Sequence, residues 1–210
     1  MREEPNIVFL VNDHQAYYRH GWDSGIGPQR PAFNRLAAGG IRFDRAYTAV
    51  PLCLPARRTI ATGMYPHNHG ALSNDKMRES LLEDLYFGRL AGQGYRNVYV
   101  GKWHAGPGTA YDYGCEGYSY PLYGNPYVTD EYRAYLKQKE LPVARFAIER
   151  RFWAELPESG EYTCEKPNWC NEHASGLMLT PRETHESFFL ADMACNWLRE
   201  LAVSDRPFAL

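Results

Sequence analysis

The stretch NIVFLV, Asn6 to Val11, is a run of apolar and β-branched side chains that leads into the polar sequence NDH. A continuous apolar run of this length is typical of a parallel strand that is buried on both faces of a sheet. The polar residues that follow would then lie at the carboxyl end of the strand. The stretch therefore predicts a buried strand that delivers Asp13 and His14 to a site.

Helix signals alternate with strand signals downstream of this stretch. In PAFNRLAAGG, Pro31 is well placed to begin a helix, and the two glycines at the end of the stretch stop it. A second helix is predicted in ESLLEDLYFGRLAGQG, and a short strand over 98–100 leads into GKWH. This alternation predicts an α/β fold with a mostly parallel sheet, whose ligands gather at the carboxyl ends of the strands. The second helix is indicated by Leu81, Leu82, Leu85 and Leu90, with Gly92 and Gly94 at its end.

From about residue 106 to residue 179 the character of the sequence changes, because tyrosine, proline and glycine interrupt the patterns. Helical patches are predicted only around 131–139 and 144–156. A long excursion of this kind in a compact domain is usually a functional loop. Regular structure is predicted to resume with Thr180 as the N-cap of a helix, and the final RPFAL indicates the start of a buried strand.

The composition argues against several classes of protein. The formal net charge of the 210 residues is −2, from 23 basic and 25 acidic side chains, so no summed field points to nucleic acid or to a membrane surface as a partner. The N-terminal apolar run is too short for a membrane span or a signal-peptide core. We therefore expect a cytoplasmic location for the chain as written, or a periplasmic or secreted one if a signal was removed. The five cysteines form neither a disulfide framework nor a zinc motif.

The stretch CLPARRTIATG, Cys53 to Gly63, raises the question of what its cysteine does. Packing in the core is the commonest role of a free cysteine. A second interpretation is a thiol nucleophile, because a helix N-terminus and the nearby Arg57 would both stabilise a thiolate. The residues of the stretch leave both alternatives open.

The pattern Cys-x-Pro-x-Arg, followed after four residues by Thr-Gly, resembles the signature of the type I, formylglycine-dependent sulfatases. NIVFLVND, PAFNRLAAGGIRFDRAYT and GKWHAG resemble further segments of that family, which belongs to the alkaline phosphatase-like superfamily. The resemblance implies an α/β fold in which helices sandwich a mostly parallel central sheet. It also implies that residues 1–210 are a truncated N-terminal portion of a sulfatase catalytic domain, in which 106–179 is a loop-rich insertion.

The resemblance implies hydrolysis of a sulfate monoester carried by a small molecule or a carbohydrate. In the family a maturation enzyme oxidises the cysteine, here Cys53, to formylglycine, and one hydroxyl of the hydrated aldehyde attacks sulfur. The second hydroxyl then expels sulfate, which a plain serine or cysteine could not do. A helix that begins at this residue would direct backbone N–H groups at the anionic ester.

The resemblance also implies a divalent metal as cofactor. Asp13 matches the family's first metal-binding acid, whose hard oxygen suits calcium, with magnesium or manganese as alternatives. His14 stands where many sulfatases have a second aspartate, so we expect it either to bind the metal or to support a ligand. The modified Cys53 is the remaining expected ligand in this chain.

Further residues match the substrate side of the family's site. Besides Cys53, the expected catalytic residues are Arg57, which would hold the formylglycine, Lys102, which would contact sulfate oxygens, and His104, which would bond the nucleophile's hydroxyl and help it lose a proton. Lys102 and His104 would project to the same side if the backbone stays extended. Asn74 resembles a substrate-contacting asparagine of the choline-sulfatase and phosphonate-hydrolase branches, although a turn role fits it equally well.

Three other functions fit the same residues. The same architecture hydrolyses phosphonate or phosphate esters, and His14 departs from the aspartate pair that is common in sulfatases. An inactive, truncated relative that binds an anion is a second alternative. A hydrolase that uses the Cys53 thiol directly is a third.

Overall fold

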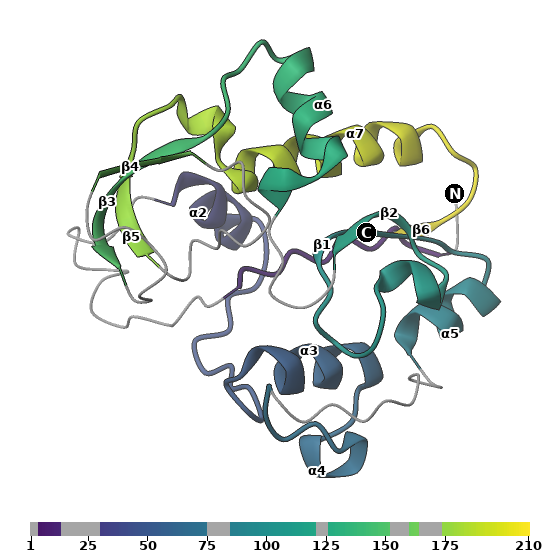
Figure 1. Cartoon of the computed structure of the whole chain (residues 1–210). Helices are drawn as coiled ribbons and strands as arrows, with labels where there is room; N and C mark the ends of the chain where they lie inside the picture. Colours follow the sequence, from purple (N-terminus) through teal and green to yellow (C-terminus); the bar gives the residue numbers. More distant parts are fainter. Residues whose placement is uncertain (1–3, 14–29, 75–84, 121–125, 152–159, 164–173) are drawn as a thin grey trace.

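The computed structural model describes residues 4–13, 30–74, 85–120, 126–151, 160–163 and 174–210, which are the coloured parts of Figure 1. Several sequence predictions fall outside the described residues, namely those for His14, for Leu81 and Leu82, and for the end of the helical patch at 152–156.

A three-stranded parallel sheet, in the order β2-β1-β6, is the centre of the described structure. β1 (Arg96–Lys102) pairs with β2 (Glu116–Tyr120) along its second half, and its first residues pair with β6 (Phe208–Ala209). The predicted parallel sheet is thus confirmed, as is the strand within RPFAL. β1 extends beyond the predicted 98–100 because its pairing with β2 continues to Lys102.

The N-terminal stretch Ile7–Val11 runs parallel to β6. Ile7 donates its N–H to the carbonyl of Phe208 at 2.8 Å, and Phe9 donates to that of Leu210 at 2.7 Å. The position of the stretch agrees with the sequence prediction, but its five side chains are 37 to 74% exposed. The predicted burial is therefore wrong for the described structure: successive side chains point to opposite faces, and the described residues cover neither face completely.

Helices lie on both sides of the central sheet (Figure 1). On one side Leu201 of α7 packs with Val98 of β1 in a buried cluster. On the other side the cluster around Phe87 and Trp103 joins α3 and α5 to the sheet. The predicted sandwich of helices around the sheet is confirmed. The bounds of these helices are Cys53–Thr62 for α3, Tyr86–Gly92 for α5 and Glu186–Ala202 for α7.

Two of the helices begin or end at the proline and glycine residues that the sequence singled out. α2 (Pro31–Ala38) has Pro31 in its first turn and stops before Gly39. α5 ends at Gly92, and Leu85 is its buried N-cap residue. A short helix, α4 (Pro66–His69), follows α3. No helix of the described residues is long and apolar enough to cross a membrane.

The excursion between 106 and 179 contains more regular structure than predicted. α6 (Asp130–Gln138) confirms the first helical patch, and Thr129 caps it by accepting the N–H of Tyr132. The second patch is wrong, because β3 (Arg145–Arg151) is the middle strand of an antiparallel sheet with order β4-β3-β5. Its residues pair on both sides, and these pairings outweigh the helical pattern. The other elements of the excursion are the 3-10 helices Ala110–Tyr113 and Pro126–Val128 and the strands β4 (Gly160–Thr163) and β5 (Ala174–Met178).

The start of α7 also differs from the prediction. A 3-10 turn occupies Arg182–Thr184, and the helix begins at Glu186 with His185 as its N-cap residue. Thr180 lies 2.8 Å from Thr184, hydroxyl to hydroxyl, instead of capping the helix. α7 then buries Phe189 among tyrosines that hold α6 and β2 against it, namely Tyr118, Tyr127, Tyr132 and Tyr135.

Candidate active site

Cys53 is the first residue of α3, as the sequence predicted for a nucleophile at a helix N-terminus. Leu52 before it is extended, and Gly63 after the helix has a φ of 70°, a left-handed conformation that glycine adopts at low cost. The Cys53 side chain is partly exposed. Because side chains four residues apart share one face of a helix, Cys53 and Arg57 lie on the same face.

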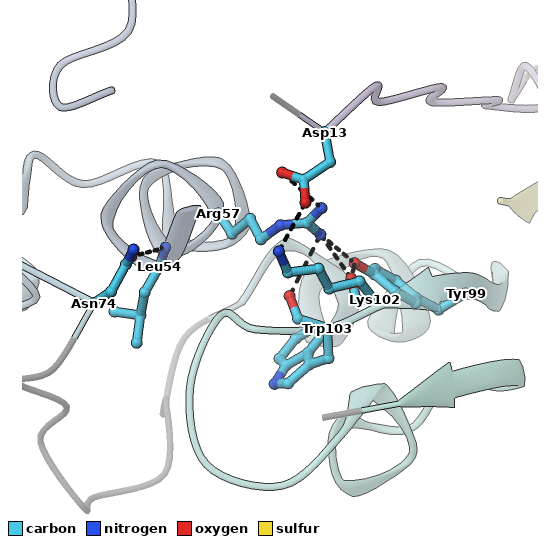
Figure 2. A network of polar contacts seen from close by, with 7 residues as sticks. All are labelled: Asp13, Leu54, Arg57, Asn74, Tyr99, Lys102 and Trp103. Atoms are coloured by element: carbon cyan, nitrogen blue, oxygen red, sulfur yellow. Dashed lines mark hydrogen bonds and ion pairs between the residues drawn. The ribbon is translucent and has the colours of Figure 1, made fainter. Parts of the chain in front are cut away.

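Asn74 lies against the first turn of α3. Its amide oxygen accepts the backbone N–H of Leu54 at 3.1 Å (Figure 2). The N-cap residue Leu52 has no side-chain acceptor, so Asn74 satisfies one of the N–H groups that every helix start leaves unbonded. The loop that carries Asn74 thus supports the helix turn that carries Cys53.

Arg57 ties α3 to the end of β1. Its Nη1 atom donates to the carbonyl oxygen of Lys102 at 2.6 Å and lies 3.4 Å from that of Trp103 and 3.2 Å from the hydroxyl of Tyr99. The side chain is only 15% exposed. These contacts, seen together in Figure 2, fix α3 relative to the carboxyl end of the central strand.

Asp13 meets two cations at the same place. Lys102 Nζ lies 2.7 Å from one carboxylate oxygen of Asp13, and Arg57 Nη2 lies 3.7 Å from the other. The Lys102 side chain is 9% exposed and that of Asp13 is 40% exposed. Residues from the N-terminal stretch, α3 and β1 therefore converge on one charged cluster, as expected for the carboxyl ends of neighbouring parallel strands.

His104 is buried beside this cluster, with 1% of its surface exposed. Burial lowers its pKa to about 4, and the charges of Lys102 and Arg57 act in the same direction while Asp13 opposes them. The imidazole is therefore neutral at pH 7. An extended backbone would project His104 to the same side as Lys102. The backbone is not extended at His104, whose φ is 40°. A non-glycine residue in this region stores strain, which is commonest at functional sites.

Asp13 is the candidate metal ligand among the described residues. Asp13 offers a hard, partly exposed carboxylate of the kind that calcium, magnesium or manganese prefers. Among the described residues no group of three His, Cys, Asp or Glu side chains lies close enough to hold an ion. The Asp13 carboxylate has the donor chemistry for such a cation, and position 53 would offer oxygen donors only after oxidation of Cys53 to formylglycine, whereas His14 lies outside the described residues.

Sequence reasoning did not single out Tyr99, whose hydroxyl donates to the Lys102 carbonyl at 2.6 Å. In the sequence Tyr99 is one aromatic residue in an apolar strand, which is a common core residue. Its contact with Arg57 depends on how α3 lies against β1, which the sequence of the strand does not indicate.

The site combines a helix N-terminus, two cations and a neutral histidine at the carboxyl end of a parallel sheet. This arrangement suits an anionic ester. The sulfatase family model matches residues 5–209, and the chain belongs to this family. It is 33% identical to an ulvan-active sulfatase of Formosa agariphila over 147 residues, which are 69% of this chain and 29% of that protein. It is 35% identical to human arylsulfatase A over 109 residues, which are 50% of this chain and 22% of that protein.

Two further comparisons involve one curated relative and one solved structure. An N-acetylglucosamine-6-O-sulfatase of Bacteroides thetaiotaomicron is 33% identical over 103 residues, or 49% of this chain and 18% of that protein. The solved structure of BT4656 in complex with D-glucosamine-2-N,6-O-disulfate superposes with a TM-score of 0.54 at 19% identity, over 98% of this chain and 33% of that one. The likeness supports the fold, and the chain spans a third or less of the length of these relatives.

Proposed function

We propose that the protein hydrolyses sulfate monoesters, and that the described residues form the nucleophile side of its site. The observation that carries the proposal is the position of α3. Its first residue is Cys53, and Arg57 one turn later binds the strand end at which Lys102 and Asp13 pair. In this proposal a maturation enzyme converts Cys53 to formylglycine, and the hydrated aldehyde supplies an oxygen nucleophile for attack on sulfur.

Each side chain of the site has a part in the proposed reaction. The N-terminus of α3 presents backbone N–H groups and positive dipole to the anionic ester. Lys102 binds sulfate oxygens and offsets their charge as it increases in the transition state. His104 is neutral, so it can accept a proton at an imidazole nitrogen from the nucleophile's hydroxyl. Arg57 holds the nucleophile helix in place and adds positive charge near it.

The proposed cofactor is a divalent cation, calcium first, with magnesium or manganese as alternatives. Asp13 would hold it together with residue 53 and, in this proposal, His14. The cation would supply a positive charge for the sulfate oxygens. Because Asp13 now pairs with Lys102 at 2.7 Å, a cation on Asp13 would leave the lysine for the substrate.

The proposed substrate class is a sulfated carbohydrate. Support comes from the names of the relatives, which include an ulvan-active sulfatase and an N-acetylglucosamine-6-O-sulfatase, and from the disulfated glucosamine bound in BT4656. The amide oxygen of Asn74 accepts the backbone N–H of Leu54. Its amide nitrogen is the group that we propose to contact a substrate oxygen.

The test is a kinetic comparison of 4-nitrophenyl sulfate with a phenyl phosphonate ester, on protein purified from its native source. We expect faster turnover of the sulfate ester, and loss of that turnover in the Cys53→Ala variant. A clear preference for the phosphonate ester would replace the proposal with a phosphonate hydrolase of the same architecture. Equal turnover by wild type and Cys53→Ala would refute the proposed nucleophile, and inactivity on both esters would favour an anion-binding relative.

A further inference from the structure

Tyr99 occupies a rigid position beside the site. It lies in the middle of β1, and its ring meets those of Phe87 and Trp103 edge to face, at centroid distances of 6.1 and 5.5 Å. Edge-to-face contacts of this kind restrict the orientation of each ring. The Tyr99 hydroxyl is therefore held in one place by packing that does not involve the charged residues.

This hydroxyl makes two polar contacts at once. It donates to the carbonyl oxygen of Lys102 at 2.6 Å and accepts from Nη1 of Arg57 at 3.2 Å. A phenol has one donor and two acceptor lone pairs, so both contacts are compatible as long as it keeps its proton. Burial raises the pKa of Tyr99 and outweighs the opposing effect of Arg57, so the proton stays on at neutral pH.

The contacts of Arg57 divide between its two terminal nitrogens. Nη1 faces Tyr99 and the backbone carbonyls of Lys102 and Trp103, whereas Nη2 faces the carboxylate of Asp13 at 3.7 Å. A guanidinium is planar, so acceptors that fix the directions of the N–H bonds at one terminal nitrogen also set the direction of the other terminal nitrogen. The acceptors at the end of β1 thus determine how Arg57 presents itself to the site.

We propose that Tyr99 is a positioning residue, which orients the Arg57 guanidinium toward Asp13 without touching the substrate. This inference rests on the proposed function and deepens it. Without the hydroxyl, the acceptors of Nη1 would be the two backbone carbonyls of Lys102 and Trp103, which restrict the guanidinium less. The hydroxyl adds a third acceptor, which belongs to a side chain and is held in place by the packing of its ring against Phe87 and Trp103.

The test is the variant Tyr99→Phe, which removes one oxygen and keeps the ring packing. Loss of one hydrogen bond to a charged group should lower kcat for 4-nitrophenyl sulfate about tenfold, which corresponds to about 1.4 kcal/mol. KM should change less than about twofold, since an effect on orientation acts on the reacting groups rather than on substrate binding. The matched control is Tyr95→Phe, because the buried Tyr95 also donates to a backbone carbonyl, that of Pro5 at 2.9 Å, at the other end of β1.

A crystal structure of Tyr99→Phe supplies a readout that does not depend on activity. We expect the Arg57 guanidinium to leave its position beside Lys102 O and Asp13, with the fold unchanged. An unmoved guanidinium, an unchanged kcat, or equal losses in Tyr99→Phe and Tyr95→Phe would each overturn the inference. If wild type does not turn over sulfate esters, the proposed function fails, while the position of the guanidinium still decides the role of Tyr99.

Discussion

Replacing Asn74 by alanine separates two roles that its position allows, the support of α3 and contact with substrate. The Asn74 amide oxygen is the side-chain acceptor for the Leu54 N–H, at 3.1 Å, and Leu52 at the N-cap position has none to offer. Loss of a helix cap costs about 0.5–2 kcal/mol. Since this contact is partly buried, we expect Asn74→Ala to lower the free energy of unfolding by about 1 kcal/mol.

Asn74→Asp sharpens the comparison because it keeps an acceptor oxygen and adds a negative charge. A carboxylate at a helix N-terminus is favourable by about 0.3–1 kcal/mol. The aspartate variant should therefore be at least as stable as wild type. The same charge would repel an anionic ester at the start of α3, so we expect the KM for a sulfate ester to rise in Asn74→Asp.

Urea unfolding of wild type and both variants, with KM measured on the same samples, is the assay. Asn68→Ala is the matched control, because Asn68 is an exposed asparagine of the neighbouring helix α4 and should leave stability unchanged. Unfolding of Asn74→Ala at the wild-type free energy would refute the capping role. A raised KM in Asn74→Ala with unchanged stability would leave substrate contact as its only role.

Other predictions concern charge, pH and packing. Lys102→Ala should lower kcat/KM for a sulfate ester about a hundredfold, whereas Lys139→Ala, which removes an exposed ion pair with Asp192 at 2.9 Å, should not. The pKa of His104 is lowered from 6.5 to about 4, so the contribution of this histidine to the free energy of unfolding is fully present above pH 6.5 and is lost as the pH falls toward 4. His104→Gln should flatten this dependence in urea titrations without abolishing it, because burial lowers the pKa of His69 and His185 as well. Gly117→Ala should destabilise the fold by about 3 kcal/mol in the same assay, since Gly117 has a φ of 108° and an added Cβ would collide with the Tyr99 carbonyl.

The parts of the fold that sequence reasoning predicted depend on local signals. Pro31 and Gly39 bound α2, and α5 ends at Gly92. The wrong predictions occur where residues far apart in the sequence determine the secondary structure. The stretch 145–151 carries apolar residues that fit either period, and its pairing with two other strands decides the outcome.

The candidate site shows the same division. Asp13, Arg57 and Lys102, predicted from motifs far apart in the sequence, meet in one cluster, because the ends of β1 and the N-terminal stretch lie together. The role of Tyr99 was not predictable, since it depends on the position of Arg57 on another element. The capping contact of Asn74 likewise needs the return of its loop to α3.

The mass of one peptide tests the central claim most directly. Trypsin should release residues 46–57 as AYTAVPLCLPAR, in which Cys53 is the sole cysteine. In protein from the native source we predict the mass that corresponds to formylglycine in place of cysteine. An unmodified cysteine in that peptide, from protein that turns over a sulfate ester, would contradict the proposed nucleophile.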